Sequence, residues 1–259
     1  MDDATLIGRR RTSQMAFYRA LGSAGAGSHW REVRPGVQAT VVPAAPDRSL
    51  PNSVLYTDAH GLLDAHDEIA ELYAAAGVRA WTVWVVPGDD ELAVSLEARG
   101  HTLDGSPALM VAAMEEVDLG RDDEPQPLDL DPEPDWRVIG DLNDRAYGLP
   151  DATFAPCVAR MHDPAVHGFV ARLDGVPVAC LATVDGPDGD CALELVATLP
   201  QARGRGLASA LVRHALRAAR ARGCDSASLE GSKMGEPVYA RLGYRTLGRL
   251  RMYERRSDV

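Results

Sequence analysis

The hydrophobic pattern in the second half of the chain changes from a strand period to a helix period around residue 200. Residues 193–196 include a short apolar run without turn residues, which is typical of a strand covered on both faces. Pro200 cannot continue an inner strand, so the chain is expected to leave the sheet there. Over residues 207–219 apolar side chains recur at helical spacing, with arginines on the opposite face. The pattern therefore predicts a strand over residues 191–198, a glycine-rich turn and a helix that ends at Gly223.

Shorter periodic segments surround this unit. Asp174-Gly175 is a strong signal for a two-residue hairpin, and Pro237 and Gly243 suit the first turn and the end of a short helix. The predicted elements are helices over residues 139–147, about 154–162 and 237–242, and strands over 166–173, 176–184 and 227–230.

The first half shows a similar alternation of elements. We predict helices over about residues 13–21, 63–76 and 89–99, and strands over 30–42 (with a turn at Pro35-Gly36), 54–56, 80–86 and 107–114. Gly77 and Gly100 flank a strand and a helix, as Gly223 and Gly243 do later in the chain. This correspondence predicts an internal duplication.

The segment between the halves is rich in proline and in acidic residues, which keep a chain extended. With 259 residues the sequence fits two compact halves. We therefore expect domains at residues 1–120 and 136–259, joined by a linker at 121–135.

Charge and composition narrow the classes of function. The net charge of −11 disfavours nucleic acid as a partner, because phosphate backbones bind basic surfaces. The sequence contains no apolar run of the ~20 residues that cross a membrane and no signal-peptide pattern, so we expect a cytoplasmic protein without a membrane partner. The four cysteines form no Cys-x-x-Cys pair and are expected to be reduced and buried, and we expect no metal site.

The turn Pro200–Gly206 has the chemistry of a pyrophosphate cradle, since two glycines and two arginines precede the N-terminus of a helix. A nucleoside-triphosphate loop is disfavoured because Gly206 is followed by Leu207-Ala208 rather than Lys-Ser/Thr. The dinucleotide fingerprint fits less well than the pattern Gln/Arg-x-x-Gly-x-Gly/Ala, which is met by Gln201, Gly204 and Gly206.

With this turn and a second motif, Tyr239-Ala240-Arg241-Leu242-Gly243-Tyr244, the chain resembles the GNAT superfamily of acyl-CoA-dependent N-acyltransferases. The resemblance implies an α/β fold of two GNAT-like units, each a twisted, mixed, mostly antiparallel sheet flanked by helices. Only the second unit is expected to be active. Near the equivalent turn the first unit has Asp58-Ala59-His60-Gly61, and the counterpart of Tyr239 is close to Leu96.

The resemblance also assigns roles to residues. Acetyl-CoA or coenzyme A is the implied co-substrate. Its pantetheine arm would pair with the backbone of Val196, Ala197 and Thr198, and its pyrophosphate would lie on the turn and the first helical residues. The residues expected there are Arg203, Gly204, Arg205, Gly206, Leu207, Ala208 and Ser209.

The resemblance implies that the hydroxyl of Tyr239 lies near the coenzyme sulfur and protonates it as it departs, and a phenol is protonated at neutral pH. Glu194 and Glu230 are the candidates for the general base, and Asp190 is a weaker third. His167 and His214 are expected to be structural or exposed. Candidates for substrate contact are Tyr147, Phe154 and His162, for which ordinary packing is the competing interpretation.

We therefore predict an N-acetyltransferase that acts by direct attack of a primary amine in a ternary complex, since no cysteine lies in a nucleophile motif. The partner would be a small-molecule amine or a peptide amine, with a homodimer left open. The alternative is a non-catalytic protein that binds or senses acyl-CoA.

Overall fold

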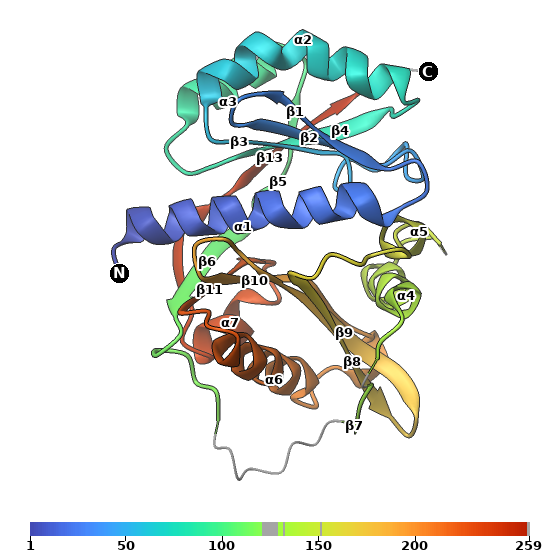
Figure 1. Ribbon diagram of the computed structural model, residues 1–259, viewed down its shortest axis with the longest axis vertical. Helices are drawn as coiled ribbons and strands as arrows, with labels where there is room; N and C mark the ends of the chain where they lie inside the picture. The colour runs from blue at the N-terminus through green and yellow to red at the C-terminus, as the bar shows by residue number, and fades with distance from the viewer. Residues whose placement is uncertain (121–128, 132, 151, 258–259) are drawn as a thin grey trace.

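The computed structural model describes residues 1–120, 129–131, 133–150 and 152–257. Two sheets lie on either side of the long helix α1 (Asp3–Ala24), as Figure 1 shows. One face of α1 packs against the first sheet and the other against the second. The helix therefore forms a central layer that belongs to both units.

The first sheet has six strands in the order β1-β2-β3-β4-β13-β5. All neighbours are antiparallel except β3 and β4, which are parallel and connected through helix α2. The bounds are β1 His29–Arg34, β2 Val37–Val41, β3 Ser53–Tyr56, α2 Ala59–Ala75, β4 Ala80–Val85, α3 Asp90–Glu97, β5 Thr102–Gly105 and β13 Arg251–Arg256. Helix α2 covers the outer face of this sheet (Figure 1).

The second sheet has seven strands in the order β12-β6-β11-β10-β9-β8-β7. Again one pair is parallel, β10 with β11, and helix α6 connects its strands and covers the outer face. The bounds are β6 Ala108–Ala113, β7 Asp129–Leu130, α4 Trp136–Tyr147, α5 Ala155–Val158, β8 Val166–Leu173, β9 Val176–Asp185, β10 Asp190–Thr198, α6 Leu207–Ala221, β11 Ser226–Gly231, α7 Glu236–Arg241 and β12 Arg245–Arg249.

The two sheets have the same plan and exchange one strand. In order, β1 to β4 with α2 and α3 correspond to β8 to β11 with α6 and α7. The strand next to β11 is β6, from the first half of the chain, and the strand next to β4 is β13, from the C-terminus. The predicted division into residues 1–120 and 136–259 therefore does not coincide with the two sheets. Each sheet contains strands from both segments.

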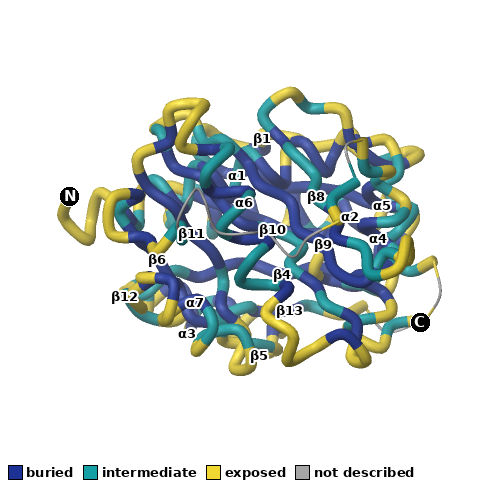
Figure 2. The backbone as a smooth tube through the Cα atoms, turned by 90° about the horizontal axis from the view of Figure 1, so that it is seen from below, coloured by how far each residue is buried: buried dark blue, intermediate teal, exposed yellow. Residues whose placement is uncertain are grey.

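Apolar burial follows these layers. Figure 2 shows the buried backbone concentrated in the sheet strands and the exposed positions mostly in the connecting loops. One core lies under α6, another under α2, and a third joins α1 to both sheets. No helix within the described ranges is both long and apolar enough to cross a membrane.

Most predicted elements are confirmed, with shifted boundaries. The first helix is longer than the predicted 13–21 because Asp2 caps its N-terminus by accepting from Thr5. The helix predicted over 154–162 is the single turn α5. Strands β5, β7, β12 and β13 were not predicted, and β7 lies within the segment 121–135 that was expected to be the linker, where it pairs with β8. Residues 121–128 and 132 of the expected linker lie outside the described residues.

Candidate active site

Strands β10 and β11 pair only over their first residues. Asp190–Leu193 pairs with Ser226–Leu229, and beyond that point the parallel strands separate. A bulge against β9 lies between Glu194 and Ala197. Within it Leu195 has a φ of 54°, which non-glycine residues seldom adopt. Beyond the separation no described strand pairs with residues 195–198 on the β11 side, so this edge of β10 can accept an extended ligand.

The predicted cradle follows directly. Gly204 and Gly206 have φ angles of 74° and 76°, and a Cβ added at either glycine would meet no atom within 4 Å. Gly206 is the N-cap of the 15-residue helix α6, and no side chain bonds to the free N–H groups there. These groups and the helix dipole face open space, which is the geometry of an anion site.

The two arginines of the turn differ in placement. Arg203 donates from Nε to the carbonyl of Thr198 (3.1 Å) and from Nη2 to that of Ala146 (2.9 Å), so it connects the end of β10 to α4. Arg205 is exposed and does not line the cavity described next.

A cavity of about 950 Å³ connects the cradle, the open edge of β10 and helix α7. It collects the predicted base candidates Glu194 and Glu230, the predicted acid Tyr239, and two of the predicted substrate contacts, Tyr147 and Phe154. The predicted coenzyme-binding residues that line it are Val196, Ala197, Thr198, Arg203, Gly204, Gly206, Leu207, Ala208 and Ser209. Residues that are distant in the sequence therefore share one space.

Both glutamates are held by an arginine that the sequence interpretation missed. Arg10 of α1 is 1% exposed. It donates from Nη2 to Oε1 of Glu194 (2.8 Å) and from Nε to Oε1 of Glu230 (2.9 Å). Gln14, one turn later, also donates to Oε1 of Glu230 (3.0 Å). The signal was present, because Arg10 and Gln14 interrupt the apolar stripe that contains Leu6 and Phe17.

The burial of Glu194 raises its pKa to about 7, although Arg10 acts in the opposite direction. A carboxyl group with this pKa can exchange a proton near neutral pH. Asp190 begins β10 and is buried, and it accepts from the hydroxyls of Ser226 and Ser228. Burial raises the pKa of Asp190, and this side chain does not line the cavity.

Tyr239 lies on α7 and faces the cavity. Burial raises its pKa, with smaller contributions from Tyr147 and Glu230, so the phenol keeps its proton. Among the described residues its hydroxyl makes no hydrogen bond. Tyr147 is 58% exposed, and its hydroxyl donates to the carbonyl of Val196 (3.0 Å), at the open edge of β10.

The opposite wall of the cavity comes largely from the first half of the chain, which the sequence did not indicate. Phe17, Tyr18 and Leu21 come from α1, Leu50 and Pro51 from the loop before β3, and Trp84 from β4. The exchanged strand β13 adds Met252, which pairs with Trp84.

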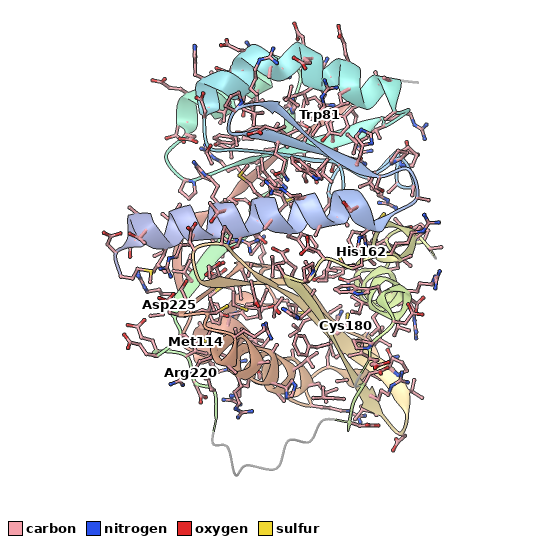
Figure 3. The ribbon with its side chains drawn as sticks, in the orientation of Figure 1. Trp81, Met114, His162, Cys180, Arg220 and Asp225 are labelled. Carbon is pink, nitrogen blue, oxygen red and sulfur yellow. The ribbon has the colours of Figure 1, made fainter. Side chains whose placement is uncertain are left out.

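The histidines lie elsewhere. His167 contacts Asp185 (3.2 Å) and His214 packs edge-on against Phe169, as expected for structural residues. His162, labelled in Figure 3, is exposed after α5 and does not line the cavity.

The equivalent position in the first unit is filled. The side chain of Tyr56 is buried after the β3–β4 pairing ends, and its hydroxyl donates to Asp89 and accepts from the N–H of Val86 (3.3 Å). Asp58 caps α2 by accepting from the N–H of His60 (3.0 Å). A carboxylate therefore lies where the second unit has an open cradle.

Comparisons with known proteins agree with this geometry. Residues 130–244 match the family described as Acetyltransferase (GNAT) family. No curated protein matches the chain. A GCN5-related N-acetyltransferase from Kribbella flavida is similar in structure with a TM-score of 0.67 and 19% identity, covering 95% of this chain and 96% of that one.

A tandem GNAT protein from the clavulanic acid biosynthesis pathway has a TM-score of 0.60 and 15% identity, covering 99% of this chain and 97% of that one. A GCN5-related N-acetyltransferase from Sphaerobacter thermophilus has a TM-score of 0.55 and 16% identity, with coverage of 86% and 78%. These likenesses extend over both sheets, whereas the family match covers the second part alone. Residues 130–244 thus match the GNAT acetyltransferase family, and the chain as a whole is similar in fold to a tandem GNAT protein.

Proposed function

We propose that this protein transfers an acetyl group from acetyl-CoA to a primary amine by direct attack in a ternary complex. The observation that carries the proposal is the single cavity in which the open edge of β10, the uncapped start of α6, Glu194 and Tyr239 meet. We further propose that all residues that act on the reacting atoms lie within 136–259, while residues 1–120 position them and bind no coenzyme A.

The residues present fit acetyl-CoA. The backbone N–H groups from Gly204 to Ser209 would hold the pyrophosphate in the space that a Cβ would enter at either glycine. The free edge at residues 196–198 would pair with the pantetheine amides, as a strand pairs with a sheet edge. Tyr147 would have to release the Val196 carbonyl first, which its exposure allows. Acetyl-CoA supplies an activated acyl group on a thiol leaving group.

The chain's own residues would manage two protons. The amine nitrogen bonds to the acetyl carbon while the carbon–sulfur bond breaks. The carboxylate of Glu194 would accept the proton that the amine loses. The hydroxyl of Tyr239 would donate the proton that the departing thiolate gains. Glu194 is the preferred base because its pKa of about 7 lets it ionise at neutral pH and accept a proton during turnover.

One observation favours the alternative function of binding or sensing acyl-CoA without catalysis. Arg10 engages both Glu194 and Glu230, so neither carboxylate is free of a cationic partner. The two functions differ in what the glutamates must do. A sensor needs them only for the packing of α1, whereas a transferase needs Glu194 to accept protons.

Glu194→Gln tests the assignment, because glutamine keeps the size of the side chain and Arg10 keeps its contact with Glu230. We expect kcat for acetyl transfer to fall by about 10²–10⁴, the usual effect of removing a general base. Affinity for acetyl-CoA, measured by calorimetry, should stay unchanged. Glu230→Gln is the matched control and should lower kcat less. Equal turnover in wild type and Glu194→Gln would reject the base, and absence of turnover in wild type with intact coenzyme binding would favour the sensor.

A further inference from the structure

We propose that the acceptor is a monoamine with an apolar body, an alkylamine or arylalkylamine without a second charge. The inference rests on the transfer reaction proposed above and concerns the half of the cavity that lies away from the cradle. Three features of that half support it. The wall is apolar, several polar groups already form hydrogen bonds within the protein, and the charged side chains leave room for one positive charge on the ligand.

Aromatic and aliphatic side chains form the wall. Phe17 and Tyr18 pack edge to face with ring centroids 5.5 Å apart, and Tyr18 and Trp84 are 6.4 Å apart. These rings and Leu21 belong to the core that joins the two units. A surface of this kind stabilises an apolar ligand in proportion to the area that it removes from water.

Several polar groups of this region are already engaged within the protein. Trp84 donates from Nε1 to Oγ of Ser53 (2.9 Å), and Ser53 in turn donates to the carbonyl of Leu50 (2.7 Å). Asn143 donates to the carbonyls of Ile139 (2.9 Å) and Leu195 (3.2 Å). A polyhydroxylated acceptor would lose its hydration without gaining matching partners, at a cost for each buried hydroxyl.

The charges admit one ammonium group. The charged side chains that line the cavity are Glu194, Glu230, Arg203 and Arg241, and the arginines lie on the turn and on α7, at the coenzyme side. Arg10 offsets part of the negative charge of the two glutamates. A second ammonium group would therefore lack a carboxylate. An α-carboxylate on the acceptor would be repelled by the glutamates.

The experiment measures kcat/KM for acetyl transfer to linear amines from n-propylamine to n-hexylamine, and to glucosamine and putrescine. Each methylene should raise kcat/KM by about fourfold, the equivalent of ~0.8 kcal/mol per buried methylene. Glucosamine and putrescine should react less well than n-hexylamine. In parallel, calorimetry measures the binding of n-hexylamine to the protein saturated with coenzyme A, which reports on the pocket without requiring turnover.

Leu50→Asn and Leu103→Asn form a matched pair of variants. Leu50 lines the cavity and is 46% exposed, whereas Leu103 lies on the edge strand β5, is 53% exposed and does not line the cavity. Both substitutions replace a half-exposed leucine, so neither is expected to prevent folding. Leu50→Asn should reduce the ratio of kcat/KM between n-hexylamine and n-propylamine by about three- to tenfold. Leu103→Asn should leave the ratio unchanged.

The outcomes separate the two proposals. A higher kcat/KM for glucosamine or putrescine than for n-hexylamine would overturn the proposal of an apolar monoamine acceptor. It would still support the proposal that the protein is an acetyltransferase. Saturable n-hexylamine binding without transfer to any amine overturns the transferase and supports the apolar pocket. Absence of both n-hexylamine binding and transfer overturns the acceptor class, as does an equal loss of selectivity in Leu50→Asn and Leu103→Asn.

Discussion

Replacing Arg10, which lies in the first half of the chain, by methionine should raise the pKa of Glu194, the proposed general base in the second half. Arg10 is buried on α1 and contacts Glu194 and Glu230, so it is a positioning residue that does not line the cavity. Methionine has a similar length and carries no charge. Without the guanidinium, burial and the charge of Glu230 act on Glu194 without opposition, and its pKa of about 7 must rise.

The magnitude follows from the distance. Opposite unit charges about 4 Å apart interact by roughly 4 kcal/mol at an effective dielectric constant of 20, which corresponds to about three pKa units. Water that enters the site will reduce this value, and we expect about two units. At pH 7.5 such a shift lowers the ionised fraction of Glu194 from about 0.8 to about 0.03. Turnover at that pH should therefore fall by about 25-fold.

The assay is the pH profile of kcat between about pH 6 and 10, with an acceptor whose own pKa lies below this range. The rise of kcat with pH should move upward by about two units in Arg10→Met, and kcat should recover at high pH. A structural defect alone would lower kcat at every pH. Melting temperature and coenzyme A affinity are measured on the same samples, because leaving carboxylates buried without their partner can cost about 3–5 kcal/mol.

Two controls sharpen this test. Arg10→Lys keeps the positive charge but loses the two-point contact of the guanidinium, so it should shift the profile less than Arg10→Met does. The double variant Arg10→Met/Glu230→Gln removes the neighbouring negative charge and should move the profile back toward the wild type. An unshifted profile in a folded Arg10→Met protein would refute both the ion-pair argument and the assignment of Glu194.

Three further predictions test other parts of the molecule. Gly204→Val should abolish coenzyme A binding in calorimetry, because it strains a φ of 74° and fills the open cradle. If the variant bound coenzyme A with wild-type affinity, the pyrophosphate would have to bind elsewhere. Tyr239→Phe should lower kcat by about 10²–10⁴ with little change in KM; an unchanged kcat with a lower melting temperature would make Tyr239 a core residue. The buried pair His66–His101 (Nε2 to Nε2, 3.1 Å) should make stability fall as pH drops from 6.5 toward 4, because burial lowers the pKa of His101 to about 4 and the folded state favours the neutral ring. His101→Gln should make the melting temperature fall less steeply as the pH is lowered. An unaltered dependence of melting temperature on pH would contradict the role of His101 in this decline.

The cradle and its flanking elements could be predicted because their causes are local. Two glycines with positive φ angles, the proline that ends the strand and the 3.6-residue period of the helix all lie within one continuous segment. The motif around Tyr239 is similarly local. Together they predicted most of the residues that line the cradle side of the cavity, and Arg205 is the exception.

The remainder of the site depends on contacts between distant parts of the chain. The continuous apolar run of residues 108–113 predicts a buried strand and is compatible with a place in either sheet, so it could not reveal that β6 pairs with β11. The buried polar residues Arg10 and Gln14 lie on a helix predicted to begin only near residue 13. Their partners, on β10 and β11, are about 200 positions away in the sequence.

The strand exchange joins the unit without an open cradle to the unit that has one. Beside β11, which carries Glu230, lies β6 from the first half, and beside β4, which carries Trp84, lies β13 from the C-terminus. Removing either half would leave an inner strand of the other sheet without its neighbour. The first unit therefore contributes to the cavity although Asp58 and Tyr56 fill its own turn, because it supplies β6, one wall of the cavity and Arg10, which pairs with Glu194.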